Sequence, residues 1–102
     1  MPQFESTNET YRDSDFLCFR VGTVNGLWRL TPTHYEILAV VNHQKGNGHF
    51  KKAMWWFEQS CRRDGKKLML REIWNIQLLL KCRKMGYTLV PGTLFTYEKA
   101  FV

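Results

Sequence analysis

A loop with two glycines joins an apolar segment to a basic one and has the residue types of an anion site. It spans residues 41–50 and reads VNHQKGNGHF, with Gly46 and Gly48 one residue apart. Glycines allow the backbone to approach a ligand closely, and successive free amides form a nest for an anion. A helix beginning after Gly48 would add its own unpaired N–H groups and dipole. With Lys45 and Lys51 nearby, the pattern is that of a pyrophosphate site, although a tight turn uses the same glycines.

Two common nucleotide-binding motifs do not fit this loop. The chain has no G-x-x-x-x-G-K-[ST] sequence, which a P-loop requires. A dinucleotide fingerprint would need a third glycine and a βαβ unit, whereas three strands are expected before this loop. No H-E-x-x-H sequence, Ser-His-Asp pattern or carboxylate cluster is present, so hydrolases and metalloenzymes have little support and no metal is expected.

The residues before the loop predict three consecutive strands. Residues 16–24 and 27–30 are apolar or β-branched and flank Asn25-Gly26, a strong hairpin signal because both turn residues take positive φ. Residues 35–41 (YEILAVV) are more continuously apolar. Such a run is typical of a central strand that is covered on both faces.

The residues after the loop predict two helices and three further strands. Apolar residues recur with helical spacing across residues 49–63, and Gly65 provides a stop for that helix. Residues 67–73 favour a strand, and Asn75 is a good N-cap for a second helix that ends before Gly86. Residues 87–90 and 94–101, on either side of Pro91-Gly92-Thr93, then predict a closing hairpin.

The resulting order is β-β-β-α-β-α-β-β, an α/β (α+β) fold with a mixed, mainly antiparallel central sheet and helices on its faces. Residues 1–14 are polar and are expected to form a flexible N-terminal arm. Residues 15–102 are expected to form one domain, since 102 residues with 44% hydrophobic content suffice for a single core.

Composition also bears on the cellular setting. No stretch reaches the roughly 18 apolar residues that a membrane span needs. Three widely spaced cysteines do not make a disulfide framework, so the reducing cytoplasm is the expected location.

Charge is distributed unevenly. Residues 1–15 carry a net −3, and the remainder carries +9 of the overall +6. A basic body fits a nucleic acid, a phosphorylated cofactor or an acidic protein, and equally a surface that only confers solubility. Nucleic acid is not the first choice, because no long Lys/Arg run, zinc-finger spacing or RNP-like motif is present.

Two sequence blocks together resemble the GNAT superfamily of acyl-CoA-dependent N-acyltransferases. The family loop Q/R-x-x-G-x-G/A corresponds to His43-Gln44-Lys45-Gly46-Asn47-Gly48, with His43 replacing the leading Gln or Arg. The family block N-x-x-A-x-x-L-Y-x-K-x-G-F is matched by Asn75, Lys84 and Gly86, with Tyr87 in place of Phe. The resemblance covers about residues 16–101. The N-terminal strand and helix pair of the family, which often form one wall of the acceptor site, have no counterpart.

The resemblance implies a binding site for acetyl-CoA as cosubstrate. The loop amides would bind the pyrophosphate with help from lysine charge, and the backbone of the third expected strand would pair with the pantetheine arm. The residues assigned to the cofactor in this way are Ala39, Val40, Val41, Lys45, Gly46, Asn47, Gly48, His49, Lys51 and Asn75.

The resemblance also suggests catalytic residues. Glu36 is the only acid in the third expected strand and would be the general base, with His34 two residues away on the same face. Cys82 stands where the family commonly has a tyrosine general acid. The alternatives are a surface carboxylate paired with an arginine for Glu36, an ordinary structural histidine for His34, and a small buried residue for Cys82.

Three functions follow from these features. The first is transfer of an acetyl group from acetyl-CoA to an amine of a small molecule or protein. The second is a catalytically inactive module that binds CoA or a partner protein, in the style of the compact, host-directed members that phage genomes carry. The third is a small basic nucleic-acid-binding protein. A homodimer would supply the missing wall of the acceptor site.

Overall fold

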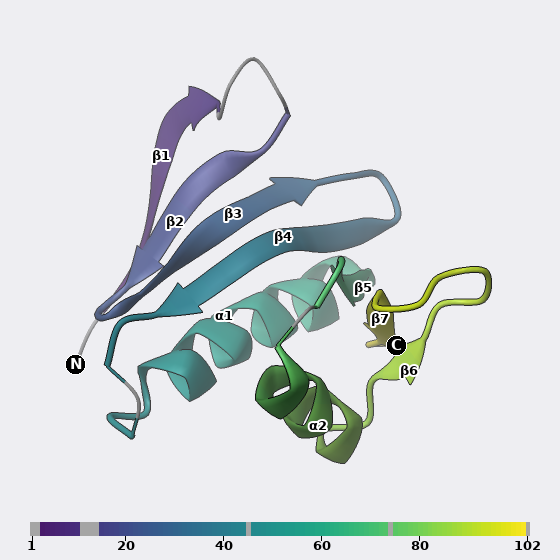
Figure 1. Ribbon diagram of the computed structural model, residues 1–102. Helices are drawn as coiled ribbons and strands as arrows, with labels where there is room; N and C mark the ends of the chain where they lie inside the picture. The colour runs from purple at the N-terminus through teal and green to yellow at the C-terminus, as the bar shows by residue number, and fades with distance from the viewer. Residues whose placement is uncertain (1–2, 11–14, 45, 74, 102) are drawn as a thin grey trace.

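The computed structural model describes residues 3–10, 15–44, 46–73 and 75–101. They form an α+β fold with one mixed, mostly antiparallel sheet and two helices, which confirms the predicted class (Figure 1). The elements are β1 Phe4–Thr10, β2 Leu17–Val21, β3 Val24–Leu30, β4 His34–Asn42, α1 His49–Asp64, β5 Lys67–Leu70, α2 Ile76–Lys84, β6 Thr88–Leu89 and β7 Tyr97–Ala100.

The strands form a seven-stranded sheet in the order β1-β2-β3-β4-β5-β7-β6. Of its strand pairs only β4 and β5 run parallel, in register from His34↔Lys67 to Ile37↔Leu70. Parallel neighbours need a long crossover, and α1 provides it. The glycine loop joins the end of β4 to the start of α1.

The N-terminal segment departs from the sequence prediction of a flexible arm. The structure instead places residues 4–10 in β1, which pairs antiparallel with β2. The ring of Phe4 stacks on that of Trp56 with centroids 3.6 Å apart, and it also packs against Phe19. The ring contacts of Phe4 and the backbone pairing with β2 therefore hold this segment as a strand, although its composition is otherwise typical of a loop. Residues 1, 2 and 11–14 of the predicted arm lie outside the described residues.

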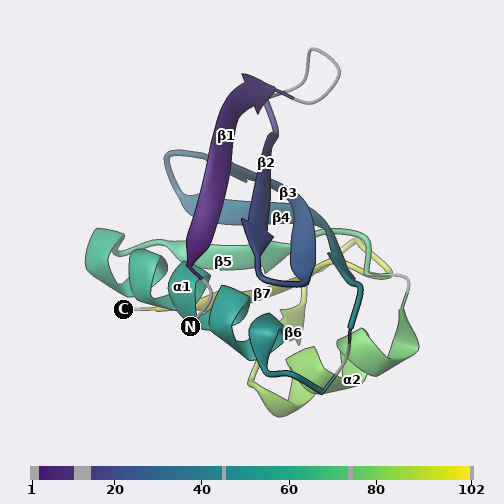
Figure 2. The same ribbon diagram turned by 90° about the vertical axis from the view of Figure 1, so that its left-hand side faces the viewer.

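Both helices lie on the same side of the sheet (Figures 1 and 2). The sequence prediction placed helices on both faces, so this point is a correction. Helix α1 packs its predicted stripe into the core, and α2 contributes Leu79 and Cys82 to the same core. The two helices also meet each other, since the Lys81 ammonium lies 5.5 Å from the centre of the Phe50 ring. The opposite face of the sheet carries no helix in the described chain.

A bulge in β4 divides that strand into two halves. Its pairing with β3 passes from Trp28↔Ile37 to Leu27↔Ala39, so Leu38 has no counterpart. The sequence prediction placed the first hairpin turn at Asn25-Gly26, and this is wrong: the turn lies at Gly22-Thr23, and Gly26 is a residue of β3 that pairs with Val40. A Cβ on Gly26 would lie 2.0 Å from the carbonyl oxygen of Ala39. Only glycine fits opposite the bulge, and the bulge lies where β4 separates from β5.

Candidate functional site

Strands β4 and β5 separate after their fourth residue pair. The last backbone link between the two segments is the bond from the Arg71 N–H to the Ile37 carbonyl, at 2.8 Å. The chain then turns away, and the Ile73 N–H bonds the Phe95 carbonyl instead. From residue 39 to residue 42, β4 is paired with β3 along one edge, while no described residue pairs with its other edge. An open strand edge of this kind can accept an extended ligand as an added strand.

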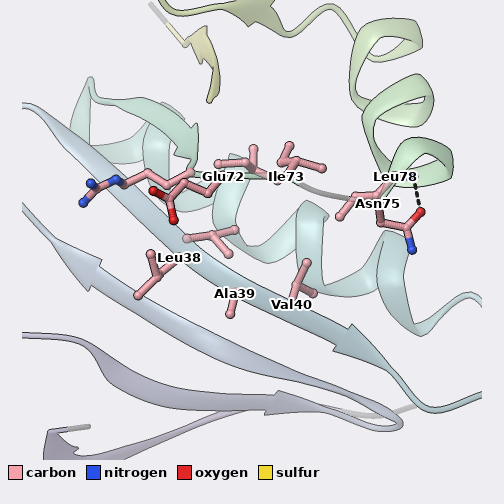
Figure 3. A pocket seen from close by; sticks show the side chains of 10 residues that line it. Leu38, Ala39, Val40, Glu72, Ile73, Asn75 and Leu78 are labelled. Atoms are coloured by element: carbon pink, nitrogen blue, oxygen red, sulfur yellow. Dashed lines mark hydrogen bonds between the residues drawn. The ribbon is translucent and has the colours of Figure 1, made fainter. Parts of the chain in front are cut away.

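Two adjoining hollows occupy the space beside this open edge, and together they form what we call the β4–α2 groove. The first has a volume of about 260 Å³ (Figure 3). Its lining residues are Ile37, Leu38, Ala39, Val40, Leu70, Arg71, Glu72, Ile73, Asn75 and Leu78. The second is about 570 Å³ and is lined by Val40, Val41, Asn42, Gly46, Gly48, Phe50, Lys51, Asn75, Gln77, Leu78 and Lys81. Because the two share Val40, Asn75 and Leu78, the groove is continuous.

One end of the groove is suited to an anion. Gly46 and Gly48 have φ values of 85° and 79°, which favour glycine, and nothing lies within 4 Å of where a Cβ would stand. The first N–H groups of α1 face this end, and those of Phe50 and Lys51 have no acceptor among the described residues. The side chains of Lys51 and Lys81 line the same hollow. Amides, helix dipole and ammonium groups all favour negative charge here.

Most residues predicted from the sequence to bind the cofactor line this groove. They are Ala39, Val40, Val41, Gly46, Gly48, Lys51 and Asn75. The amide oxygen of Asn75 also accepts bonds from the N–H groups of Gln77 and Leu78, at 2.9 and 3.2 Å. The predicted N-cap is therefore confirmed, and it fixes the start of α2 at the groove wall.

Asn47 and His49 have a different role from the one predicted. The Asn47 side chain donates to the Thr23 hydroxyl at 2.8 Å and accepts from the His49 N–H at 3.0 Å. The His49 Nδ1 accepts from the Thr23 N–H at 3.0 Å, and its ring fills the space where a Cβ on Gly22 would stand. These contacts tie the loop to the β2–β3 turn, and the His49 amide is no longer free for a ligand. Lys45 lies outside the described residues.

Glu36 lies in a buried ion cluster and not in the groove. It is 2% exposed, and its carboxylate accepts bonds from Arg71 at 2.7 Å, Arg29 at 3.2 Å and His34 Nε2 at 3.0 Å. Burial alone would raise the pKa of Glu36, but the bonds from Arg71 and His34 and the charge of Arg29 outweigh it and hold the pKa below its ordinary value.

This geometry corrects the predicted catalytic pair. A carboxylate held as an anion by three partners is a weak proton acceptor, and neither Glu36 nor His34 lines the groove. The alternative for Glu36 was a surface carboxylate paired with an arginine. The structure shows the pairing with arginine, but Glu36 is buried and not on the surface. The cluster instead joins β3, β4 and the end of β5.

Cys82 is also displaced from its predicted role as general acid. It is fully buried and belongs to the core, and burial followed by the charge of Glu58 raises the pKa of its thiol to about 11. The helical phase explains the difference, since Leu78 and Lys81 of α2 line the groove while Cys82 points inward. The alternative of a small buried residue therefore describes Cys82.

The sequence analysis missed several groove residues that follow β5. Arg71, Glu72 and Ile73 were expected to continue that strand, but pairing ends at Leu70 and the segment becomes the wall of the first hollow. Glu72 has φ of 54° and is the only non-glycine residue with positive φ among those described. The sequence did contain one signal for this change of direction, which is the charged residue Glu72 near the end of the strand predicted over residues 67–73.

The described residues contain no group of three or more His, Cys, Asp or Glu side chains arranged to hold a metal ion. In the same part of the chain, neither helix is both long and apolar enough to cross a membrane. Comparison with protein-family models, with curated proteins and with solved structures finds no match to this chain.

Proposed function

We propose that the protein is an N-acyltransferase of the GNAT type that transfers an acetyl group from acetyl-CoA to an amine of a small molecule or protein. The observation that carries the proposal is the separation of the parallel pair β4 and β5 into a groove that leads to the N-terminus of α1. A continuous groove with an open strand edge and an anion-binding end suits a long ligand that has phosphates at one end.

The three parts of acetyl-CoA correspond to three parts of the groove. The pyrophosphate would bind the amides of Phe50 and Lys51. The pantetheine arm, which has amide groups, would pair with the open edge of β4 beside Val40. The thioester would then lie in the first hollow, between Leu38 and the residues that follow β5. The apolar lining in the middle matches the weakly polar arm.

The sequence resemblance to the family is a second argument for the proposed function. The glycine loop ends at the start of α1, and Asn75 caps α2 on the opposite wall. The two sequence blocks that resemble the family therefore flank one groove. The face of the sheet that lacks helices corresponds to the missing N-terminal helix pair, so the acceptor would approach from this open side or against a second protomer.

One observation favours a second candidate, a module that binds acyl-CoA without turning it over. Among the described residues, no tyrosine, cysteine or histidine lines the groove, so the side chain types that most often protonate a departing thiolate are not found there. In a reactive complex, solvent would have to provide that proton.

Calorimetric titration of acetyl-CoA, with ATP and dephospho-CoA as comparisons, tests the proposal. Gly48→Glu places a carboxylate at the anion end, and we expect acetyl-CoA to bind at least tenfold more weakly because like charges repel. Gly92→Glu is the matched control, since Gly92 has φ of 84° and the same empty surroundings but lies outside the groove. Equal affinity of the wild type and both variants would show that the ligand is bound elsewhere.

A further inference from the structure

We propose, on the basis of the function above, that Glu72 is the proton acceptor of the groove and that its strained backbone conformation is kept for this role. Glu72 differs from Glu36 in its backbone conformation and in having no described partner for its carboxylate.

Glu72 occupies a conformation that side chains other than glycine and asparagine seldom adopt. Its φ of 54° lies in the left-handed region, where a Cβ crowds the backbone. Glycine or asparagine would be more stable at this position. Residues held in such conformations cluster at active sites and ligand-binding sites.

The neighbouring backbone fixes this conformation from two sides. The Arg71 N–H bonds Ile37 of β4, at 2.8 Å. The Glu72 N–H bonds the hydroxyl of Thr96 at 3.3 Å, and the Ile73 N–H bonds Phe95 at 2.8 Å. Glu72 is thus the residue at which the chain changes partner from β4 to the segment before β7, and its side chain leaves the backbone in a fixed direction.

The carboxylate of Glu72 is available to a ligand. Its side chain lines the first hollow together with Leu38 and Val40 of the opposite wall, and Figure 3 shows it between the end of β5 and the bulged part of β4. No described residue makes a hydrogen bond or ion pair with this carboxylate. Its neighbour Arg71 is already bonded to Glu36. Among the described residues that line the groove, Glu72 is the only acid.

Glu72 takes one proton from the ammonium group of the acceptor, and the freed nitrogen lone pair forms a bond to the thioester carbon of acetyl-CoA. The C–S bond then breaks with its electron pair on sulfur. The nitrogen loses its second proton through water to the thiolate, which gives the amide and CoA thiol, and Glu72 returns its proton to solvent.

Three variants of the full chain test the proposal. Turnover is followed by release of free thiol from acetyl-CoA, with a polyamine, a lysine-containing peptide and an arylalkylamine as acceptors. In Glu72→Gln, we expect kcat to fall by about 10²–10⁴-fold while acetyl-CoA affinity stays within twofold. Glu98→Gln, which removes a carboxylate of β7 outside the groove, is the control and is expected to keep full turnover.

Glu72→Gly separates the catalytic role from the strain. We expect it to raise Tm by about 4–8 °C, because the left-handed conformation costs glycine nothing. The same variant should lose turnover and recover part of it when sodium formate supplies a carboxylate, whereas Glu72→Gln should not respond to formate. A residue that only shaped the loop would not give formate rescue.

Several results would overturn the proposal. Turnover of Glu72→Gln within twofold of wild type would remove the proton role, and an unchanged or lower Tm of Glu72→Gly would remove the strain. Acetyl-CoA binding by the wild type without thiol release from any acceptor would also exclude the role while leaving the binding module. Absence of acetyl-CoA binding would instead mean that the proposed function itself fails.

Discussion

Strand β4 is paired on both edges over its first half and on one edge over its second. The first half, His34 to Ile37, lies between β3 and β5, and its Glu36 is enclosed by three cationic or polar partners. The second half, from Leu38 to Asn42, borders the groove. The bulge at Leu38 separates them, so one strand provides a rigid cluster and a binding edge within nine residues.

The same contrast holds for the two carboxylates near this junction. Glu36 is buried, bonded to two arginines and a histidine, and kept ionised. Glu72 is exposed and strained, and no described partner bonds its carboxylate. A fully bonded carboxylate stabilises the fold, whereas a carboxylate left unbonded in a hollow can exchange a proton with a ligand. Both carboxylates lie on or just after a central strand, so their positions in the sequence do not show which of them is bonded.

The largest effect is expected from breaking the cluster in the first half of β4. Glu36→Ala would leave two arginines facing each other with their shared acceptor removed. We expect the free energy of unfolding in urea to fall by about 3 kcal/mol, at the lower end for a buried pair because both arginines retain some solvent contact. The control is Glu5→Ala, which removes an exposed partner of Arg20 and should cost under about 1 kcal/mol. Equal losses would mean that the cluster is no more important than a surface pair.

A second, smaller effect concerns pH. Because the pKa of Glu36 is lower in the folded protein than its ordinary value of 4.5, its stabilising contribution is complete above about pH 4.5 and is lost as the pH falls below it. Urea midpoints measured between pH 7 and pH 3 should therefore decline at the acid end. The decline should be shallower in Glu36→Gln, and identical slopes for the two proteins would contradict the assignment.

The smallest effect is expected at the open half of β4, from one charge at the mouth of the groove. Lys51→Glu should weaken acetyl-CoA binding by about 5- to 10-fold at low salt, because Lys51 lines the anion end. Lys52→Glu, one residue further along α1, lies over the ring of Trp55 and outside the groove. For Lys52→Glu, we expect the change in the logarithm of the acetyl-CoA affinity to be less than half of the change for Lys51→Glu. Equal losses of affinity in the two variants would mean that binding depends on the net charge of the protein and not on the position of Lys51.

Local patterns predicted both helices and most of the strands, but they placed the first hairpin turn at Asn25-Gly26 instead of Gly22-Thr23 and gave the site only in part. The stripe of α1, the Asn75 cap and the glycine after each helix follow from interactions within a few residues, and all are present in the structure. The strand at Phe4 could not be predicted, because it is held by pairing with β2 and by ring contacts with Phe19 and Trp56, which lie further along the chain. The groove residues after β5 were missed because an abrupt change of strand partner leaves no periodic signal.

Amino-acid order alone was enough to define the fold class, the glycine loop before a basic helix, and the two blocks that resemble an acyltransferase, since these depend on backbone preferences and short-range spacing. Only the tertiary structure decided which titratable residues line the groove. By residue type, Glu36, His34 and Cys82 could all act as general acids or bases. Packing places the first two in an ion cluster and the third in the core. It leaves Glu72 at the groove because a side chain's surroundings depend on segments distant in the sequence.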